Sequence, residues 1–295
     1  MARLLIYCAF YCLLSGSGCS LFTSDSESTT TSSGPVLPTP QMSVDAVLVD
    51  VQFLRIPEER GQEIEQFWQS ADEQVVELQT RKKLEANGIR VGMIPGEMPP
   101  IVQQWLTETQ KRLSEDTLEQ ASVASSTSLV PKQLTCRAGK RKELMLHSVQ
   151  DRWLPVVYQE SDSLRGDTFE APEFIFNLTA IPHGDGRATV RLVPEVKHGQ
   201  VRNMVIGSEA AFRFDWQRQR RTFDELATQI TLSPGQTIVI SGTEPARGLG
   251  NHYFVAETAQ RLKQRVVVLL RVSGTRLDDL FDPEGVSSAE RSAQR

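Results

Sequence analysis

The residues that could carry chemistry are few, and the cysteines and histidines come first. The four cysteines are Cys8, Cys12, Cys19 and Cys136, and the four histidines are His147, His183, His198 and His252. No Cys-x-x-Cys pair, His-Glu-x-x-His motif or Gly-x-Ser-x-Gly elbow accompanies them. We therefore predict no catalytic residue, no cofactor site and no metal site, and expect a protein that is not an enzyme. An unrecognised secreted hydrolase is the alternative of a different class.

Residues 1–19 have the pattern of an export signal and predict a lipoprotein signal peptide. Arg3 precedes an unbroken apolar run over residues 4–14, and small residues follow it. As a helix this run would span about 16 Å, which is too short for a hydrocarbon core about 30 Å thick. A basic residue, a short apolar segment and small residues before a cleavage site are typical of a signal peptide. No longer apolar run occurs elsewhere, so the sequence offers no transmembrane helix.

Residues 15–19, Ser-Gly-Ser-Gly-Cys, resemble the lipobox of bacterial lipoproteins, although Gly16 stands where those proteins usually carry Leu. The resemblance implies acylation of Cys19 and cleavage in front of it, with cleavage by the ordinary signal peptidase as the alternative. Acyl chains contribute about 0.8 kcal/mol per buried methylene, so two or more anchor a protein stably. In the lipoproteins that this segment resembles, Asp directly after the Cys retains the protein at the inner membrane. Here that position is Ser20, so we expect sorting to the outer membrane, with the protein facing the periplasm.

Cleavage would leave Cys136 as the one free thiol of the mature chain, so no intramolecular disulfide is expected. Because Cys136 lies in a strand-like stretch, we interpret it as a small core residue rather than a nucleophile.

The elements that must position these residues fall into successive segments. Residues 20–42 are rich in Ser, Thr and Pro, and we predict a disordered tether. Residues 43–115 predict a small α+β domain: a strand over 44–56, helical periodicity over 58–87 ending at Asn87-Gly88, a strand over 89–94, and a helix opened by Pro99-Pro100. Residues 116–132 predict a linker, and residues 274–295 a disordered tail.

Residues 133–273 predict a mainly antiparallel β-domain. Apolar residues alternate with polar ones over 174–180 and again over 190–196, and the turn 182–186 between them indicates a hairpin. Further strands are predicted over 226–232, 238–240 and 266–272. The last of these is apolar on both faces and should therefore be central.

Three of these segments, 190–196, 232–242 and 265–272, resemble the closing strands of the secretin β-domain. Secretins form ring-shaped outer-membrane gates in type II and type III secretion. Their signature has a strand ending in Pro-Glu, a Gly-Gln-Thr turn into an apolar strand, and a final hydrophobic strand. These correspond here to Pro194-Glu195, Gly235-Gln236-Thr237 and the strand after Arg265. With 136–140 and 170–172 upstream, the resemblance covers about 133–273.

The chain departs from the secretins beyond Gly242, where 243–251 replaces a segment with repeated Pro, Gly and Ile. It has neither the second hairpin pair of an inner gate nor the several N-terminal ring modules. The arrangement is similar to the truncated secretin-like envelope proteins of planctomycete-type bacteria. The resemblance thus implies the fold more directly than a pore.

The charged residues limit the classes of partner that the chain is expected to bind. A formal net charge of −5 and a pI near 5.6 do not favour nucleic acid. The basic run Arg218, Arg220 and Arg221 is interpreted as a solvated loop, with contact to an anionic glycan or lipid head group as the alternative. Asp185 and Glu195 are interpreted as polar turn residues whose mutation leaves stability largely intact.

Together these features predict an α+β protein of the cell envelope, anchored to a membrane through Cys19. We expect a structural or assembly component of a secretion or envelope complex, with other envelope or secretion-system proteins as partners. Self-association into a homo-oligomer through sheet edges is its expected mechanism, because unpaired edge strands invite pairing. The alternative is a monomeric periplasmic binding module for a protein or a cell-wall polymer.

Overall fold

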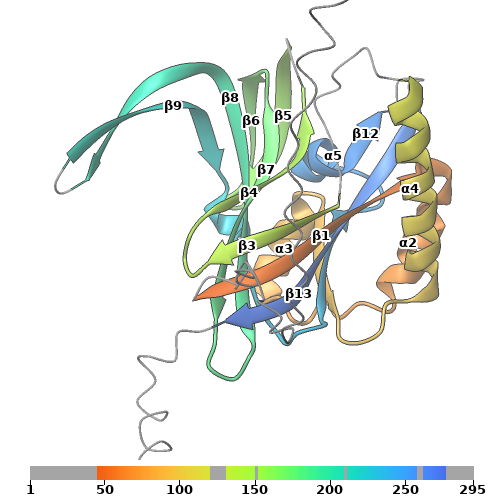
Figure 1. The fold of residues 1–295 in the computed structure, drawn as a ribbon. Coiled ribbons are helices and arrows are strands. Elements are labelled where there is room, and N and C mark those ends of the chain that lie inside the picture. The colour runs from red at the N-terminus through yellow and green to blue at the C-terminus, as the bar shows by residue number, and fades with distance from the viewer. Residues whose placement is uncertain (1–44, 120–130, 150–151, 209–210, 258–261, 277–295) are drawn as a thin grey trace, which may run out of the picture. The chain divides into compact units, whose positions relative to one another are not determined.

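The computed structural model describes residues 45–119, 131–149, 152–208, 211–257 and 262–276. Cys19, the predicted tether over 20–42 and most of the predicted tail lie outside these residues. The described residues all belong to one compact unit. The described part of this unit is an α+β fold built mainly from antiparallel strands (Figure 1).

The larger sheet, sheet A, joins strands from both ends of the described chain. Its order is β2 (Ile89–Ile94), β11 (Thr237–Gly242), β13 (Lys263–Arg276), β1 (Ala46–Pro57) and β3 (Lys132–Arg137), with β12 (Val255–Glu257) also pairing β13. Every pairing in it is antiparallel. The strand predicted to be central is confirmed as such, because β13 lies between β11 and β1 and is buried on both faces.

The strand pairing of sheet A does not follow the expected division into two domains joined by a linker over 116–132. Segments 43–115 and 133–273, expected as separate domains, contribute neighbouring strands to the same sheet: β1 pairs β13, and β2 pairs β11. The part of the expected linker over 116–119 is helical, since α4 (Pro100–Glu119) continues through it. Such long-range pairing leaves no trace in local periodicity, so sequence reasoning separated segments that fold together.

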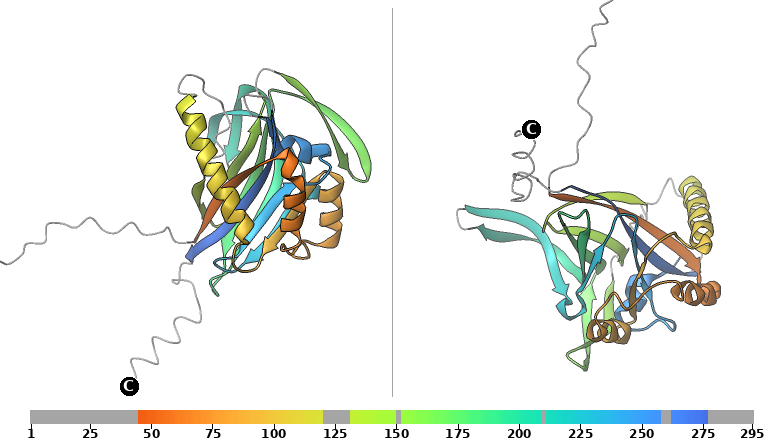
Figure 2. Two further views of the ribbon diagram at one scale, coloured as in Figure 1. Left: turned by 90° about the vertical axis from the view of Figure 1, so that its right-hand side faces the viewer. Right: turned by 90° about the horizontal axis from the view of Figure 1, so that it is seen from below.

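Helices cover one face of sheet A. The 3₁₀ turn η1 (Glu58–Arg60) leads into α2 (Gly61–Trp68), and Figure 2 shows α2 and α4 lying over the sheet. The rings of Phe67 and Trp105 pack edge to face with their centroids 5.6 Å apart, and both pack with Val267 and Leu269 of β13. Together with Trp68, these side chains form a core on this face of sheet A.

The second sheet, sheet B, packs against the other face. It comprises β4 (Lys142–Ser148), β7 (Glu173–Pro182) and β8 (Ala188–Ser208), with β10 (Thr228–Leu232) and β9 (Ala211–Thr222) pairing successive parts of β8. Alternate residues of β7 and β8 enter the core between the sheets, which confirms the predicted hairpin. The helices α3 (Leu78–Ala86) and α5 (Gly248–Phe254) and the 3₁₀ turn η2 (Asp224–Leu226) add Leu84, Tyr253 and Leu226 to this core.

The backbone segments that contain Gly88 and Gly250 pass very close to each other next to the end of α3. Gly88 follows α3 with φ +77°, which confirms the predicted helix stop. Gly250 lies in α5, and a Cβ there would stand 1.8 Å from the Gly88 carbonyl oxygen. Only glycine fits at this approach. None of the described helices is both long and apolar enough to cross a bilayer.

Candidate functional site

Two β-ribbons extend from this body. The first pairs β5 (Trp153–Glu160) with β6 (Ser163–Glu170), and the second is formed by the distal parts of β8 and β9 (Figure 1). Ser161 and Asp162 connect β5 to β6 with φ of 49° and 61°. Two central residues at positive φ are typical of a type I′ turn, whose twist matches that of the strands it joins. Sequence reasoning missed this ribbon, since its turn carries no glycine.

The β5–β6 ribbon has one buried and one exposed face. Val156, Tyr158 and Phe169 point into the core between the sheets. On the opposite face Trp153, Val157 and Leu164 are 68%, 49% and 78% exposed. Scattered apolar residues are ordinary on a surface, but three large ones on one narrow ribbon make this face a candidate interaction surface. We call these three residues the apolar outer face.

The free edge of β5 is protected. The Asn87 side chain accepts a hydrogen bond from the Gln159 amide at 2.8 Å and donates one to the Gln159 carbonyl at 3.0 Å. Residues two apart in a strand point their backbone groups to the same side, so Val157 and Pro155 also face away from β6. Pro155 has no amide proton to offer there, and proline is a common means of blunting an edge.

The free edge of β6 carries no such protection. Because Leu164, Gly166 and Thr168 oppose Gln159, Val157 and Pro155, their backbone groups point away from β5. Among the described residues, no backbone group outside β5 pairs with β6. All residues of β6 from 163 to 168 are exposed. β6 is therefore an open, solvent-facing edge without proline.

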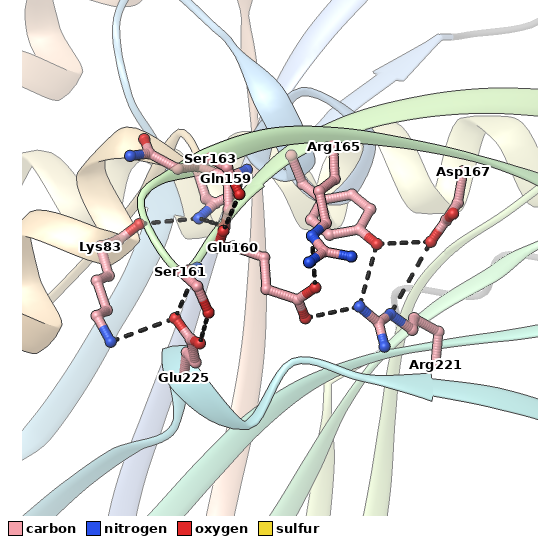
Figure 3. A network of polar contacts seen from close by, with 11 residues as sticks. Lys83, Gln159, Glu160, Ser161, Ser163, Arg165, Asp167, Arg221 and Glu225 are labelled. Atoms are coloured by element: carbon pink, nitrogen blue, oxygen red, sulfur yellow. Dashed lines mark hydrogen bonds and ion pairs between the residues drawn. The ribbon is translucent and has the colours of Figure 1, made fainter.

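A polar network fixes the tip of this ribbon to the body (Figure 3). Glu225 of η2 accepts hydrogen bonds from the Ser161 amide at 3.1 Å and the Ser161 hydroxyl at 2.6 Å, and it pairs with Lys83 at 3.3 Å. The two hydrogen bonds from Ser161, followed by Lys83, lower the pKa of Glu225 from 4.5 to about 2. The edge of β6 is thus presented by a ribbon held at its tip.

Arg221 fixes the same ribbon near its middle. Its guanidinium donates to Glu160 at 2.6 Å and to the Tyr158 hydroxyl at 3.1 Å, and Tyr158 donates to Asp167 at 2.6 Å (Figure 3). Arg221 lies in β9, where the sequence predicted a solvated loop, so that interpretation is wrong. Arg218 likewise donates to Glu173 at 2.7 Å and to the Gly199 carbonyl at 2.7 Å. The basic run holds strands together because alternate positions of β9 face different neighbours.

The interpretation of Glu195 as a polar turn residue is also wrong. Glu195 lies within β8, and it is 1% exposed. Arg141 and Asn177 donate to its carboxylate, the latter at 3.2 Å, and the Tyr253 hydroxyl donates to its backbone carbonyl at 2.7 Å. Glu143 lies beside it and pairs with Arg141, Lys197 and Arg220. This polar cluster joins β4, β7, β8 and β9 on the outward face of sheet B.

The remaining residues singled out from the sequence are cysteines and histidines. Cys19, the predicted lipid attachment site, lies outside the described residues. Cys136 is completely buried in β3, and burial raises the pKa of its thiol to about 11, in accord with its interpretation as a core residue. His147 and His252 both stack on Phe174. In the described ranges no group of three or more His, Cys, Asp or Glu side chains is placed to hold a metal ion.

A polar cleft of about 320 Å³ lies between α3, β2 and the segment before α5. Its charged groups largely neutralise one another. Arg90 pairs with Glu65 and Glu73 and stacks on Trp68, and Arg247 pairs with Glu85. The Arg90–Glu65 pair ties α2 to sheet A, and the Arg247–Glu85 pair ties α3 to the segment before α5, so the cleft has the character of a structural seam.

Comparison with known proteins adds no assignment, because no protein-family model, no curated protein and no solved structure matches the chain.

Proposed function

We propose that this chain is an exported lipoprotein of the bacterial envelope that acts as a structural or assembly component by associating with copies of itself. Acylation of Cys19 would anchor it to the membrane, and its sheet edges would join the copies. The observation that carries this proposal is the open edge of β6, whose exposed stretch 163–168 turns the backbone groups of Leu164, Gly166 and Thr168 away from β5.

The contrast between the two edges of the ribbon supports the proposal. Soluble proteins usually protect long edge strands with proline, bulges or a covering segment, because an open edge templates pairing with another chain. β5 has such protection from Pro155 and Asn87, and no residue in the described part of the chain gives β6 the same. The apolar outer face next to this edge supplies additional surface that loses water when copies meet.

The mass of the full-length protein, extracted from membranes in mild detergent, tests self-association. Light scattering should give a defined multiple of the 33.0 kDa chain mass, reduced by the cleaved signal and increased by the lipid, and negative-stain images should show particles of uniform size. A monomer at every concentration would contradict the proposal and would favour the monomeric binding module instead.

A further inference from the structure

The edge of β6 is self-complementary about its central glycine. Its outward backbone groups belong to Leu164, Gly166 and Thr168, which are spaced evenly around Gly166. In an antiparallel pair related by a two-fold axis at Gly166, each copy of Leu164 faces Thr168 of the partner subunit. The two glycines face each other, and all three facing pairs exchange both backbone hydrogen bonds.

The side chains in this register have matching charges. Arg165 and Asp167 flank Gly166, so Arg165 of each copy lies opposite Asp167 of the partner subunit, and the reverse. These positions are non-hydrogen-bonded pairs, in which facing side chains lie closest, so opposite charges there stabilise a sheet and like charges destabilise it. Both side chains are about half exposed and reach solvent at the edge.

Their present contacts leave room for a partner. Arg165 meets Glu160 through its Nε at 3.2 Å. Asp167 accepts a hydrogen bond from the Tyr158 hydroxyl and meets Arg221 at 3.9 Å, both through one carboxylate oxygen, Oδ2. A guanidinium carries five N–H donors, and a carboxylate has about four acceptor sites. A Cβ at Gly166 would have only the Val156 carbonyl oxygen of its own ribbon within 4 Å, at 3.9 Å, so no side chain obstructs approach to the centre of the edge.

We propose that β6 pairs antiparallel with β6 of a second copy of this chain, about a two-fold axis at Gly166, forming a continuous sheet β5–β6–β6–β5. This inference rests on the proposed function and deepens it by naming the edge and the occupant. The contact places Leu164 and Val157 of both copies on one face of the joined sheet. A two-fold contact closes on itself, so assemblies built on it contain an even number of copies.

Charge exchange tests the register in the full-length lipidated protein. Arg165→Asp places two aspartates opposite each other across the edge, and Asp167→Arg places two arginines opposite each other, so each variant alone should weaken self-association about tenfold or more. Mixing the two variants restores opposite charges at both positions. Differently tagged copies should therefore co-purify from the mixture and not from either variant alone, as measured by affinity capture and light scattering.

The controls separate register from folding. Arg187→Asp makes the same charge change in the exposed 183–187 turn and should leave association unchanged. Thr168→Pro removes an outward amide donor without touching the pairs with β5 and should also prevent association. Circular dichroism checks that each variant is folded, and the restored mixture shows that single variants remain competent.

Two results would overturn the inference while leaving self-association intact: variants that associate as the native chain does, or a mixture that fails to recover although Thr168→Pro abolishes association. The first would point to another edge, such as β9, as the site. A native protein that is monomeric would contradict the proposed function itself, so the two failures are distinguishable.

Discussion

At the scale of a residue, the buried position of Glu195 predicts that its mutation lowers stability, although the sequence suggested little effect. Replacing it with Ala removes the buried acceptor of Arg141 and Asn177 and leaves Arg141 only its longer contact with Glu143, at 3.8 Å. We expect the free energy of unfolding to fall by about 2 kcal/mol. Urea denaturation measures this change. Asp185→Ala, in an exposed turn, is the matched control and should change stability little; equal losses in both variants would contradict the assigned role of Glu195.

Glu225 predicts a dependence on pH. Its folded pKa is about 2, below the ordinary value of 4.5, so its contribution to stability is fully present above pH 4.5 and is lost as the pH falls toward 2. Thermal unfolding of the native chain and of Glu225→Gln, followed between pH 6 and 2.5, measures this. The difference in Tm should be constant above pH 4.5 and shrink below it. A difference that does not change with pH would show that the carboxylate charge is not what holds the ribbon.

At the scale of elements, the crossing of Gly88 and Gly250 gives the strongest steric prediction. A Cβ at Gly250 would stand 1.8 Å from a backbone oxygen, so Gly250→Ala must displace α5 from the core and should cost about 3 kcal/mol of stability. Gly96→Ala is the control, because nothing lies within 4 Å of its added carbon, and it should change stability by less than about 0.5 kcal/mol. Denaturant titration compares the two, and a tolerated Gly250→Ala would contradict this crossing.

The elements that could be predicted from the sequence are those whose burial is local. β2, the β7–β8 hairpin and β13 follow from alternation or from continuous apolar runs. The β5–β6 ribbon could not be found this way, because apolar residues occupy both of its faces and Ser161-Asp162 is not a common turn pair. The basic run and Glu195 looked solvated because their partners come from other strands. Such pairing is fixed only when the sheets assemble.

At the scale of the whole molecule, the proposed membrane anchoring rests on Cys19. Cys19→Ser removes the thiol that would accept the lipid, so under this proposal the variant should leave the membrane fraction and lack the mass of the acyl chains. Cell fractionation followed by mass spectrometry of the purified protein measures both. A variant that stays in the membrane fraction would show that something other than Cys19 holds the chain there.

The central claim is that copies of this chain meet through β6, and a cross-link in intact cells tests it most directly. In the proposed register the two Gly166 Cα atoms lie about 5.5 Å apart, within the range that a disulfide bridges. Asp185→Cys, in an exposed turn, serves as the control. Gly166→Cys should give a covalent dimer on non-reducing gels that disappears with reductant, and Asp185→Cys should give none. A Gly166→Cys chain that remains monomeric under oxidising conditions, or cross-links no more than the control, would contradict the account.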